Sequence, residues 1–205
     1  MGTRERRTRS NENDLLLSQL FVASGADSDE IAIAAVGSYG RGELSPGSDL
    51  DIVIIHSGAY QPAKLTEIVN AILYPLWDRK VKVDHSVRTK SEVKAALTED
   101  LKVIMGLLDI RLIIGDPDLV ADVQSMALSQ WREESSRYLP MLRETLDERY
   151  SRNGELAYLL EPDLKESRGG LRDITALRAM NTSGALTLPM ERISQAESIL
   201  SRVRE

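Results

Sequence analysis

Two aspartates separated by one residue, Asp49 and Asp51, stand at the start of an apolar run and follow the pair Gly37-Ser38 along the chain. In a strand, residues i and i+2 lie on the same face, which would hold these carboxylates about 7 Å apart at Cα. Mg2+ takes carboxylate and phosphate oxygens as ligands, and a pair of such ions can clamp an in-line displacement at phosphorus. The spacing therefore predicts a magnesium-dependent phosphoryl-group or nucleotidyl-group transferase.

The alternative interpretation of this pair is a capping or turn aspartate beside an exposed one. It is disfavoured for Asp51, because the charge precedes the continuous apolar run Ile52–Ile55 and would be costly beside a buried sheet without a counter-charge. Asp84 lies on the opposite face of its own strand from Val83 and Val87. If the two strands are neighbours, Asp84 can reach the same ion and help to activate an incoming hydroxyl; otherwise it is an ordinary polar-face residue.

The Gly37-Ser38 pair marks a sharp turn between a strand and a loop. Backbone N–H groups and a hydroxyl in such a turn would face the two aspartates across the strand ends, where they could bind phosphate oxygens. Arg41 could complete a triphosphate site by bidentate contact. The alternative is a tight turn followed by a surface arginine, and the nearby Asp-x-Asp pattern favours the phosphate site.

The composition limits the class of protein. The chain has 205 residues, 42% of them hydrophobic, which suits one α/β core with an appended helical part. A formal net charge of −6 disfavours nucleic acid as a partner, because proteins that bind it normally carry a basic face. The chain has no cysteine, which excludes disulfides and thiol catalysis and is compatible with the cytoplasm, the location we expect. Asp109 and Arg111 interrupt the longest apolar run, so we expect no membrane span.

The hydrophobic pattern predicts the elements that must position these residues. Two apolar runs, Ile31–Val36 and Asp49–His56, indicate strands. Gln61–Trp77 carries apolar residues at intervals of three and four, which is typical of a helix. The alternation over Val81–Val87 indicates a third strand and places His85 on its apolar face, as a core histidine. Strand, strand, helix and strand in this order predict a small sheet with helices packed on it.

Beyond Ser91 the pattern becomes helical. Two helices are expected to meet near Pro140, because proline cannot sit unperturbed inside a helix. Leu156–Leu160 could form one more strand. A turn-rich loop, Glu161–Gly170, then leads into a helix that begins near Leu171.

These observations predict an α/β fold with a small mixed sheet and helices, followed by a helical segment. We expect three regions along the chain: an N-terminal tail and helix over residues 1–29, the core over residues 30–115, and a helical extension over residues 116–205 that carries the turn-rich loop. The first region starts with charged residues, but Ser18 and Gln19 interrupt its apolar stretch, so it makes a poor signal peptide.

Residues 37–54 read GSYGRGELSPGSDLDIVI and resemble the signature of the DNA polymerase β-like nucleotidyltransferase superfamily. The central YGRGEL is more specifically similar to bacterial PII-protein uridylyltransferases. Three further stretches agree, at residues 85–89, 111–116 and 164–174, and the last is shared with the related glutamine synthetase adenylyltransferases. The resemblance covers about residues 30–180 and implies the polymerase β-like nucleotidyltransferase fold for the core.

The resemblance implies transfer of a nucleoside monophosphate from a nucleoside triphosphate, UTP or ATP, to a tyrosine hydroxyl of the trimeric PII signalling protein, with release of pyrophosphate. By position in the motif, Gly37 and Ser38 would hold phosphates. Asp49 and Asp51 would ligate Mg2+, and the third acidic ligand should fall near Asp84.

The same resemblance implies a place beside the nucleotide for five residues of the later loop: Lys165, Gly169, Gly170, Arg172 and Asp173. The two glycines would permit close backbone approach, and Lys165 could meet a phosphate. The alternative is a helix-start loop with solvated charges.

Members of this family normally continue into a histidine–aspartate hydrolase domain and two regulatory domains, and this sequence shows neither. We therefore expect the chain to modify PII, but neither to reverse the modification nor to sense small molecules. Two alternatives stay open: an adenylyltransferase that uses ATP on the same protein, and a catalytically silent module that binds PII. A transferase that modifies nucleic acid would have the same site, but the acidic balance disfavours it.

Overall fold

The structure, a computed structural model, describes residues 3–204, which form two compact units, residues 3–127 and residues 128–204. The elements of the first unit are, in chain order, α1 (Thr3–Ala23), β1 (Ile31–Ala35), α2 (Gly37–Gly40), β2 (Leu50–His56), α3 (Pro62–Asp78), β3 (Val83–Thr89), α4 (Lys90–Glu99), α5 (Leu101–Leu107) and β4 (Arg111–Gly115). Helix α6 (Pro117–Glu133) crosses the boundary between the units. The second unit continues with α7 (Ser135–Asn153), the 3₁₀ helix η1 (Leu156–Tyr158), α8 (Leu171–Thr182) and α9 (Met190–Arg204).

The sheet of the first unit has the strand order β3-β2-β1-β4. β1 pairs antiparallel with both β2 and β4, whereas β2 and β3 run parallel. The predicted α/β fold with a small mixed sheet is therefore confirmed, as are the three predicted strands. β3 begins at Val83 and ends at Thr89, slightly later than its alternation suggested, because Thr89 also caps helix α4 with its side chain.

The fourth strand, β4, was not predicted, because the whole region after Ser91 was interpreted as helical. Apolar side chains at consecutive positions in a short run cannot be told from part of a buried helix by periodicity alone. Gly115 ends the strand with φ +98°, and a Cβ there would lie 2.1 Å from the carbonyl oxygen of Ile31. Only glycine allows this close pairing with β1.

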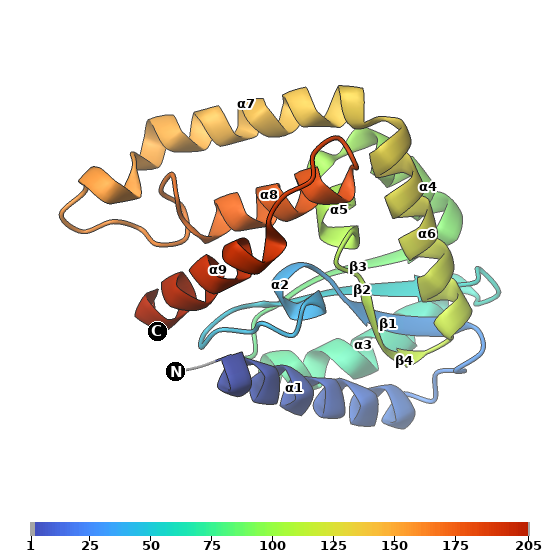
Figure 1. Ribbon diagram of the computed structural model, residues 1–205. Helices are drawn as coiled ribbons and strands as arrows, with labels where there is room; N and C mark the ends of the chain where they lie inside the picture. The colour runs from blue at the N-terminus through green and yellow to red at the C-terminus, as the bar shows by residue number, and fades with distance from the viewer. Residues whose placement is uncertain (1–2, 205) are drawn as a thin grey trace. The chain divides into compact units, whose positions relative to one another are not determined.

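Helices α1 and α3 cover one face of the sheet, and α4 and α5 lie on its other side (Figure 1). The buried core under α1 and α3 includes Leu17, Phe21, Ile33, Ile52, Ile54, Ile68 and Ile72. Full burial of each such side chain contributes about 1.5–3 kcal/mol, so this apolar face fixes the orientation of β1 and β2. Every even-numbered residue of β2 from Leu50 to Ile54 faces this core, and Asp51 therefore faces the other side.

The second unit departs from two of the sequence predictions. α6 and α7 meet at Glu134, and Pro140 lies within the first two turns of α7 instead of separating two helices. Pro140 removes one interior hydrogen bond, and the helix continues past it to Asn153. Leu156–Tyr158 forms a 3₁₀ helix in place of the predicted strand, and the neighbouring Glu155 and Arg168 form an isolated bridge.

Trp131 anchors the packing of the second unit. Its Nε1 donates a hydrogen bond to the carbonyl oxygen of Ala179 at 2.7 Å, and its ring stacks on Tyr138 with the centroids 5.4 Å apart. Arg178 and Glu197 form an ion pair between α8 and α9. Among the described residues, no helix combines the length and the apolar character that a membrane span requires.

Candidate active site

The end of β1 and the start of β2 bring the Gly37-Ser38 turn beside Asp51. The backbone N–H of Val36 donates to the carbonyl oxygen of Asp51 at 3.0 Å, as expected for antiparallel neighbours. Gly37 has φ +58°, and a Cβ built on it would lie 3.6 Å from Oδ2 of Asp51. The carboxylate of Asp51 therefore points at the turn whose backbone the sequence predicted to bind phosphate.

Asp84 lies directly beside Asp51, because β2 and β3 are parallel and pair in register at these two residues. Laterally paired residues of adjacent strands point to the same face, with the strands about 4.8 Å apart. Asp51 is half-buried and Asp84 is exposed on the edge strand. Asp49 is also exposed and lies just before the first residue of β2. The strand of Asp84 is therefore a neighbour of β2, as the sequence analysis required for Asp84 to reach the same ion as Asp51.

These carboxylates form an acidic edge and not a closed metal cage. In the part of the chain that the structure describes, no three histidine, aspartate or glutamate side chains converge closely enough to hold an ion alone. Mg2+ commonly binds through one or two carboxylates and completes its shell with water and substrate phosphates. Oxygen donors at Asp51 and Asp84, next to the Gly37-Ser38 turn, fit an ion that arrives with a nucleotide.

Helix α2 is held in place by a close backbone contact. A Cβ on Gly40 would lie 1.9 Å from the carbonyl oxygen of Asp109 and 3.1 Å from that of Ala35. The segment before β4 therefore presses directly on α2, and only glycine fits between them. Sequence reasoning noted Asp109 only as a charge that interrupts an apolar run.

Arg111 supports the same end of α2. Its Nε donates to the carbonyl oxygen of Gly40 at 3.1 Å, and its Nη2 donates to that of Tyr39 at 3.3 Å. Both terminal nitrogens also donate to the carboxylate of Asp14 in α1, at 2.9 and 3.1 Å. Burial, and then Asp14, raise the pKa of Tyr39 well above its usual range, so this tyrosine stays protonated. The stretch at residues 111–116, noticed only as a similarity, was the signal for this support.

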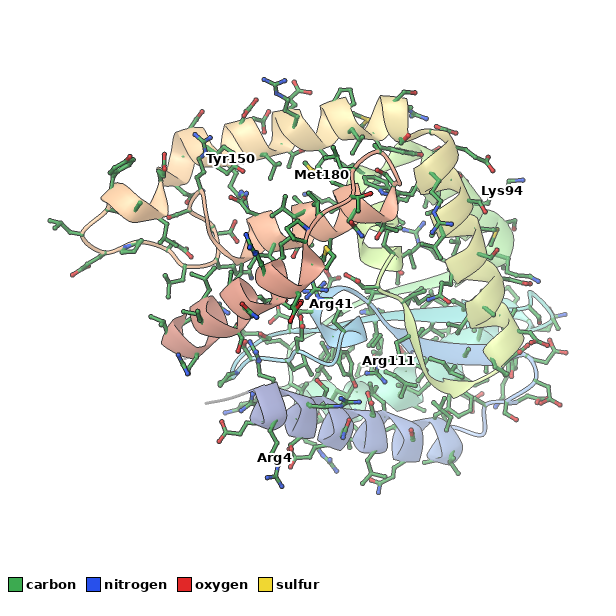
Figure 2. The ribbon with its side chains drawn as sticks, in the orientation of Figure 1. Arg4, Arg41, Lys94, Arg111, Tyr150 and Met180 are labelled. Carbon is green, nitrogen blue, oxygen red and sulfur yellow. The ribbon has the colours of Figure 1, made fainter. Side chains whose placement is uncertain are left out.

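Arg41 lies in the loop after α2 (Figure 2) and is engaged by two carboxylates. Its Nε donates to Glu43 at 2.7 Å and its Nη1 to Asp109 at 2.5 Å. Burial alone would lower the pKa of Arg41, but the charges of Asp109 and Glu43 outweigh burial and raise it. The predicted phosphate contact of Arg41 stays a prediction, and the structure adds that this guanidinium ties the loop to the segment before β4.

The loop between α2 and β2 is also fixed on α1. Nη1 of Arg9 donates to the carbonyl oxygen of Leu44 at 2.9 Å, and the buried Leu44 side chain packs in the core with α1. His85, in contrast, is exposed on β3, with its ring 6.0 Å from that of Trp77. The expectation of a core histidine was wrong, because β3 is an edge strand with no further strand beside it to bury His85.

The five predicted nucleotide-binding residues of the later loop all lie in the second unit. Gly169 has φ +90°, and a Cβ on Gly170 would lie 2.7 Å from the carbonyl oxygen of Leu164 and 2.8 Å from that of Ser167. Both glycines are therefore required by the tight turn of the loop itself. Lys165 and Arg172 are both exposed, and Arg172, in the first turn of α8, pairs with Glu166 of the loop at 2.7 Å.

Asp173 organises this loop from the first turn of α8. One carboxylate oxygen accepts from the backbone N–H of Gly169 at 2.7 Å. The other accepts from the hydroxyl of Tyr150 at 3.0 Å and from the buried Arg149. Burial and then the hydrogen bond to Asp173 raise the pKa of Tyr150, which projects from α7 (Figure 2). Sequence reasoning missed Arg149 and Tyr150, because nothing in the helical pattern of α7 marks them.

Two family models match the chain. Residues 23–106 match the family described as "Nucleotidyltransferase domain", and residues 139–201 match the family described as "GlnD PII-uridylyltransferase". The first match contains the turn and the three aspartates, and the second contains the loop of the second unit.

Curated proteins named "Bifunctional uridylyltransferase/uridylyl-removing enzyme" are similar to this chain. The one from Streptomyces coelicolor is 44% identical over 204 residues, covering 100% of this chain and 24% of that protein. The one from Corynebacterium glutamicum is 36% identical over 85% of this chain and 24% of that protein. The one from Mycobacterium tuberculosis H37Rv is 41% identical over 76% of this chain and 19% of that protein. The chain thus spans about a quarter or less of the length of these relatives.

Proposed function

Because this chain belongs to the nucleotidyltransferases of the PII-uridylyltransferase family, we propose that it transfers UMP from UTP to a tyrosine hydroxyl of a PII signalling protein and releases pyrophosphate. The observation that carries the proposal is the in-register pair Asp51 and Asp84 beside the Gly37 turn. Since UTP and PII are components of the cell interior, the proposed reaction takes place in the cytoplasm.

The turn and its support would hold the triphosphate. Backbone N–H groups at Gly37 and the hydroxyl of Ser38 would donate hydrogen bonds to phosphate oxygens. Arg41, whose Nε and Nη1 are paired with Glu43 and Asp109, would contact phosphate oxygens in competition with these two carboxylates. Because α2 is fixed by Gly40 and by Arg111, the phosphate-binding groups need not reorganise when the nucleotide arrives.

The carboxylates of the acidic edge would bind the metal ion and contact the acceptor tyrosine. Asp49, Asp51 and Asp84 would hold Mg2+, which when bound neutralises phosphate charge and eases ionisation of the acceptor. A tyrosine hydroxyl has a pKa of about 10, so it needs help to lose its proton near neutral pH. Asp84 is the exposed member of the edge, and it would face the incoming tyrosine and accept its hydrogen bond.

The loop of the second unit carries the other residues that we propose to be nucleotide-binding: Lys165, Gly169, Gly170, Arg172 and Asp173. Lys165 carries an exposed ammonium on a loop whose backbone is fixed by Gly169, Gly170 and Asp173. A preorganised cation of this kind can meet a phosphate without a large entropy loss. Arg172, which pairs with Glu166 of the loop, is proposed as a second cation beside the nucleotide.

The proposal is tested by incubating the chain with a PII protein, Mg2+ and α-labelled UTP or ATP in parallel. The expected result is label on PII and release of pyrophosphate with UTP, with little transfer from ATP. Asp51→Asn should abolish labelling while circular dichroism shows an intact fold, and the exposed Asp78→Asn should behave like wild type. Preferred transfer from ATP, PII binding without pyrophosphate release, or full activity of Asp51→Asn would each refute the proposal.

A further inference from the structure

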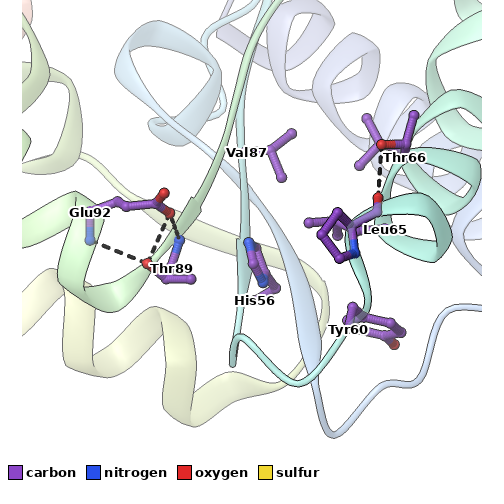
Figure 3. A pocket seen from close by; sticks show the side chains of 9 residues that line it. His56, Tyr60, Leu65, Thr66, Val87, Thr89 and Glu92 are labelled. Carbon is purple, nitrogen blue, oxygen red and sulfur yellow. Dashed lines mark hydrogen bonds between the residues drawn. The ribbon is translucent and has the colours of Figure 1, made fainter.

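A second site lies at the other end of β2, away from the proposed active site. A pocket of about 400 Å3 opens between the ends of β2 and β3, the start of α3 and the start of α4 (Figure 3). Its lining residues are His56, Tyr60, Pro62, Leu65, Thr66, Val69, Val87, Thr89 and Glu92. His56 and Asp51 are at opposite ends of one strand and on opposite faces, about 16 Å apart along it. The pocket is therefore separate from the acidic edge.

His56 gives this pocket an unsatisfied polar group. Its side chain is only 8% exposed, and Nδ1 is buried without a hydrogen-bond partner among the described residues. Figure 3 shows the ring in the middle of the pocket, between Thr89 and Glu92 on one side and Leu65 on the other. Buried polar atoms in native proteins are normally paired, and Nδ1 has almost no accessible surface, so a donor in the pocket would satisfy this orphan once the ring turns toward it. In its neutral form the ring can accept a hydrogen bond at Nδ1.

Glu92 gives the pocket a negative charge. Its Oε2 accepts from the backbone N–H of Thr89 at 2.7 Å and from the Thr89 hydroxyl at 2.8 Å. These bonds lower the pKa of Glu92, and the carboxylate is ionised near neutral pH. No lysine or arginine is among the residues that the structure shows lining the pocket; Arg88 is near Glu92 but belongs to the opposite face of β3.

The remaining walls are apolar. Leu65 and Val69 come from α3, and Val87 comes from β3. We propose that this pocket binds a small primary ammonium ion with a short branched aliphatic chain. The ammonium would donate to Nδ1 of His56 and to the carboxylate of Glu92, while the chain packs against the apolar walls. A free amino acid is a poorer fit, since its carboxylate would meet Glu92 with no lysine or arginine among the lining residues to offset it.

The probe is 3-methylbutylammonium, titrated into the whole chain while NMR follows the imidazole resonances of His56. We expect a saturable shift with a Kd on the order of 1 mM, as suits a ligand of this size. Two probes share its chain but not its charge: 3-methylbutan-1-ol is neutral and leucine is a zwitterion. Both should bind at least about fivefold more weakly.

Matched variants identify the groups involved. Glu92→Gln removes the charge but keeps an oxygen that can cap α4, so the fold should persist and affinity for the amine should fall about fivefold. Glu67→Gln changes an exposed acid of α3 outside the pocket and should leave affinity unchanged. Asp51→Asn should also leave it unchanged, which separates this site from the proposed transferase activity.

The proposal is overturned if His56 shows no saturable shift with the amine, or if the alcohol or leucine binds as tightly. Equal losses in Glu92→Gln and Glu67→Gln would also overturn it, because the effect would then be one of overall charge.

Discussion

Gly40→Ala is the substitution whose consequence the structure specifies most closely. The added Cβ would start 1.9 Å from the carbonyl oxygen of Asp109, and contacts under 3.0 Å are essentially never seen for real Cβ atoms. A second carbonyl oxygen, that of Ala35, lies at 3.1 Å. Both obstacles are backbone atoms, so no side-chain rotation can relieve the clash. Helix α2 and the segment before β4 must move apart by about 1 Å.

We expect this variant to lose about 2–3 kcal/mol of unfolding free energy, the usual cost of forcing a methyl group into a packed contact. For a chain of this length, that corresponds to a fall in Tm of about 5–10 °C. The same displacement moves Gly37 and Ser38 relative to Asp51. Since a misplacement of about 1 Å can cost about 100-fold in rate, UMP transfer should fall further than stability alone explains.

The assays are thermal unfolding followed by circular dichroism and labelled UMP transfer below the Tm of the variant. Gly106→Ala is the matched control, because Gly106 lies within helix α5 and an added Cβ would meet nothing within 4 Å. That control should be neutral or slightly stabilising, by up to about 1 kcal/mol. A Gly40→Ala protein with the Tm and the transfer rate of wild type would refute the contact that positions α2.

Three further predictions follow from single contacts. Asp84→Asn should lower the rate of UMP transfer by at least about 100-fold with little change in Tm, measured with labelled UTP, whereas equal activity would remove Asp84 from the site. Asp173→Asn should cost about 3 kcal/mol in urea unfolding, because it leaves the buried Arg149 guanidinium without its carboxylate; a loss under about 0.5 kcal/mol would show that this pair is not formed. Backbone N–H donors lower the pKa of Asp163 in the folded state, so its stabilisation is present above about pH 4 and is lost as the pH falls. The urea midpoint of wild type should therefore decline from about pH 5 to pH 3 more than that of Asp163→Asn, and parallel declines would contradict this.

The sequence was sufficient to predict a strand or helix wherever the hydrophobic pattern of neighbouring residues distinguished the two. The three apolar runs identified β1, β2 and β3, and the helical period identified α3, since side-chain alternation and helical period are properties of neighbouring residues. The same pattern failed at β4, whose Arg111–Gly115 run is too short to distinguish a strand from a buried helix. It failed again at Pro140, which lies inside α7 without ending that helix.

By itself, the sequence determined which chemical groups are available for a reaction: two carboxylates spaced two residues apart at the start of an apolar strand, and a Gly-Ser turn. It also showed a family resemblance that the comparisons confirmed. Only the tertiary structure decided which groups meet. In the folded chain, Asp84 pairs in register with Asp51, and Gly40 lies against the backbone carbonyl of Asp109. Arg149 forms an ion pair with Asp173. Those pairings join residues far apart in the chain, and they depend on strand order and helix packing, which no local pattern encodes.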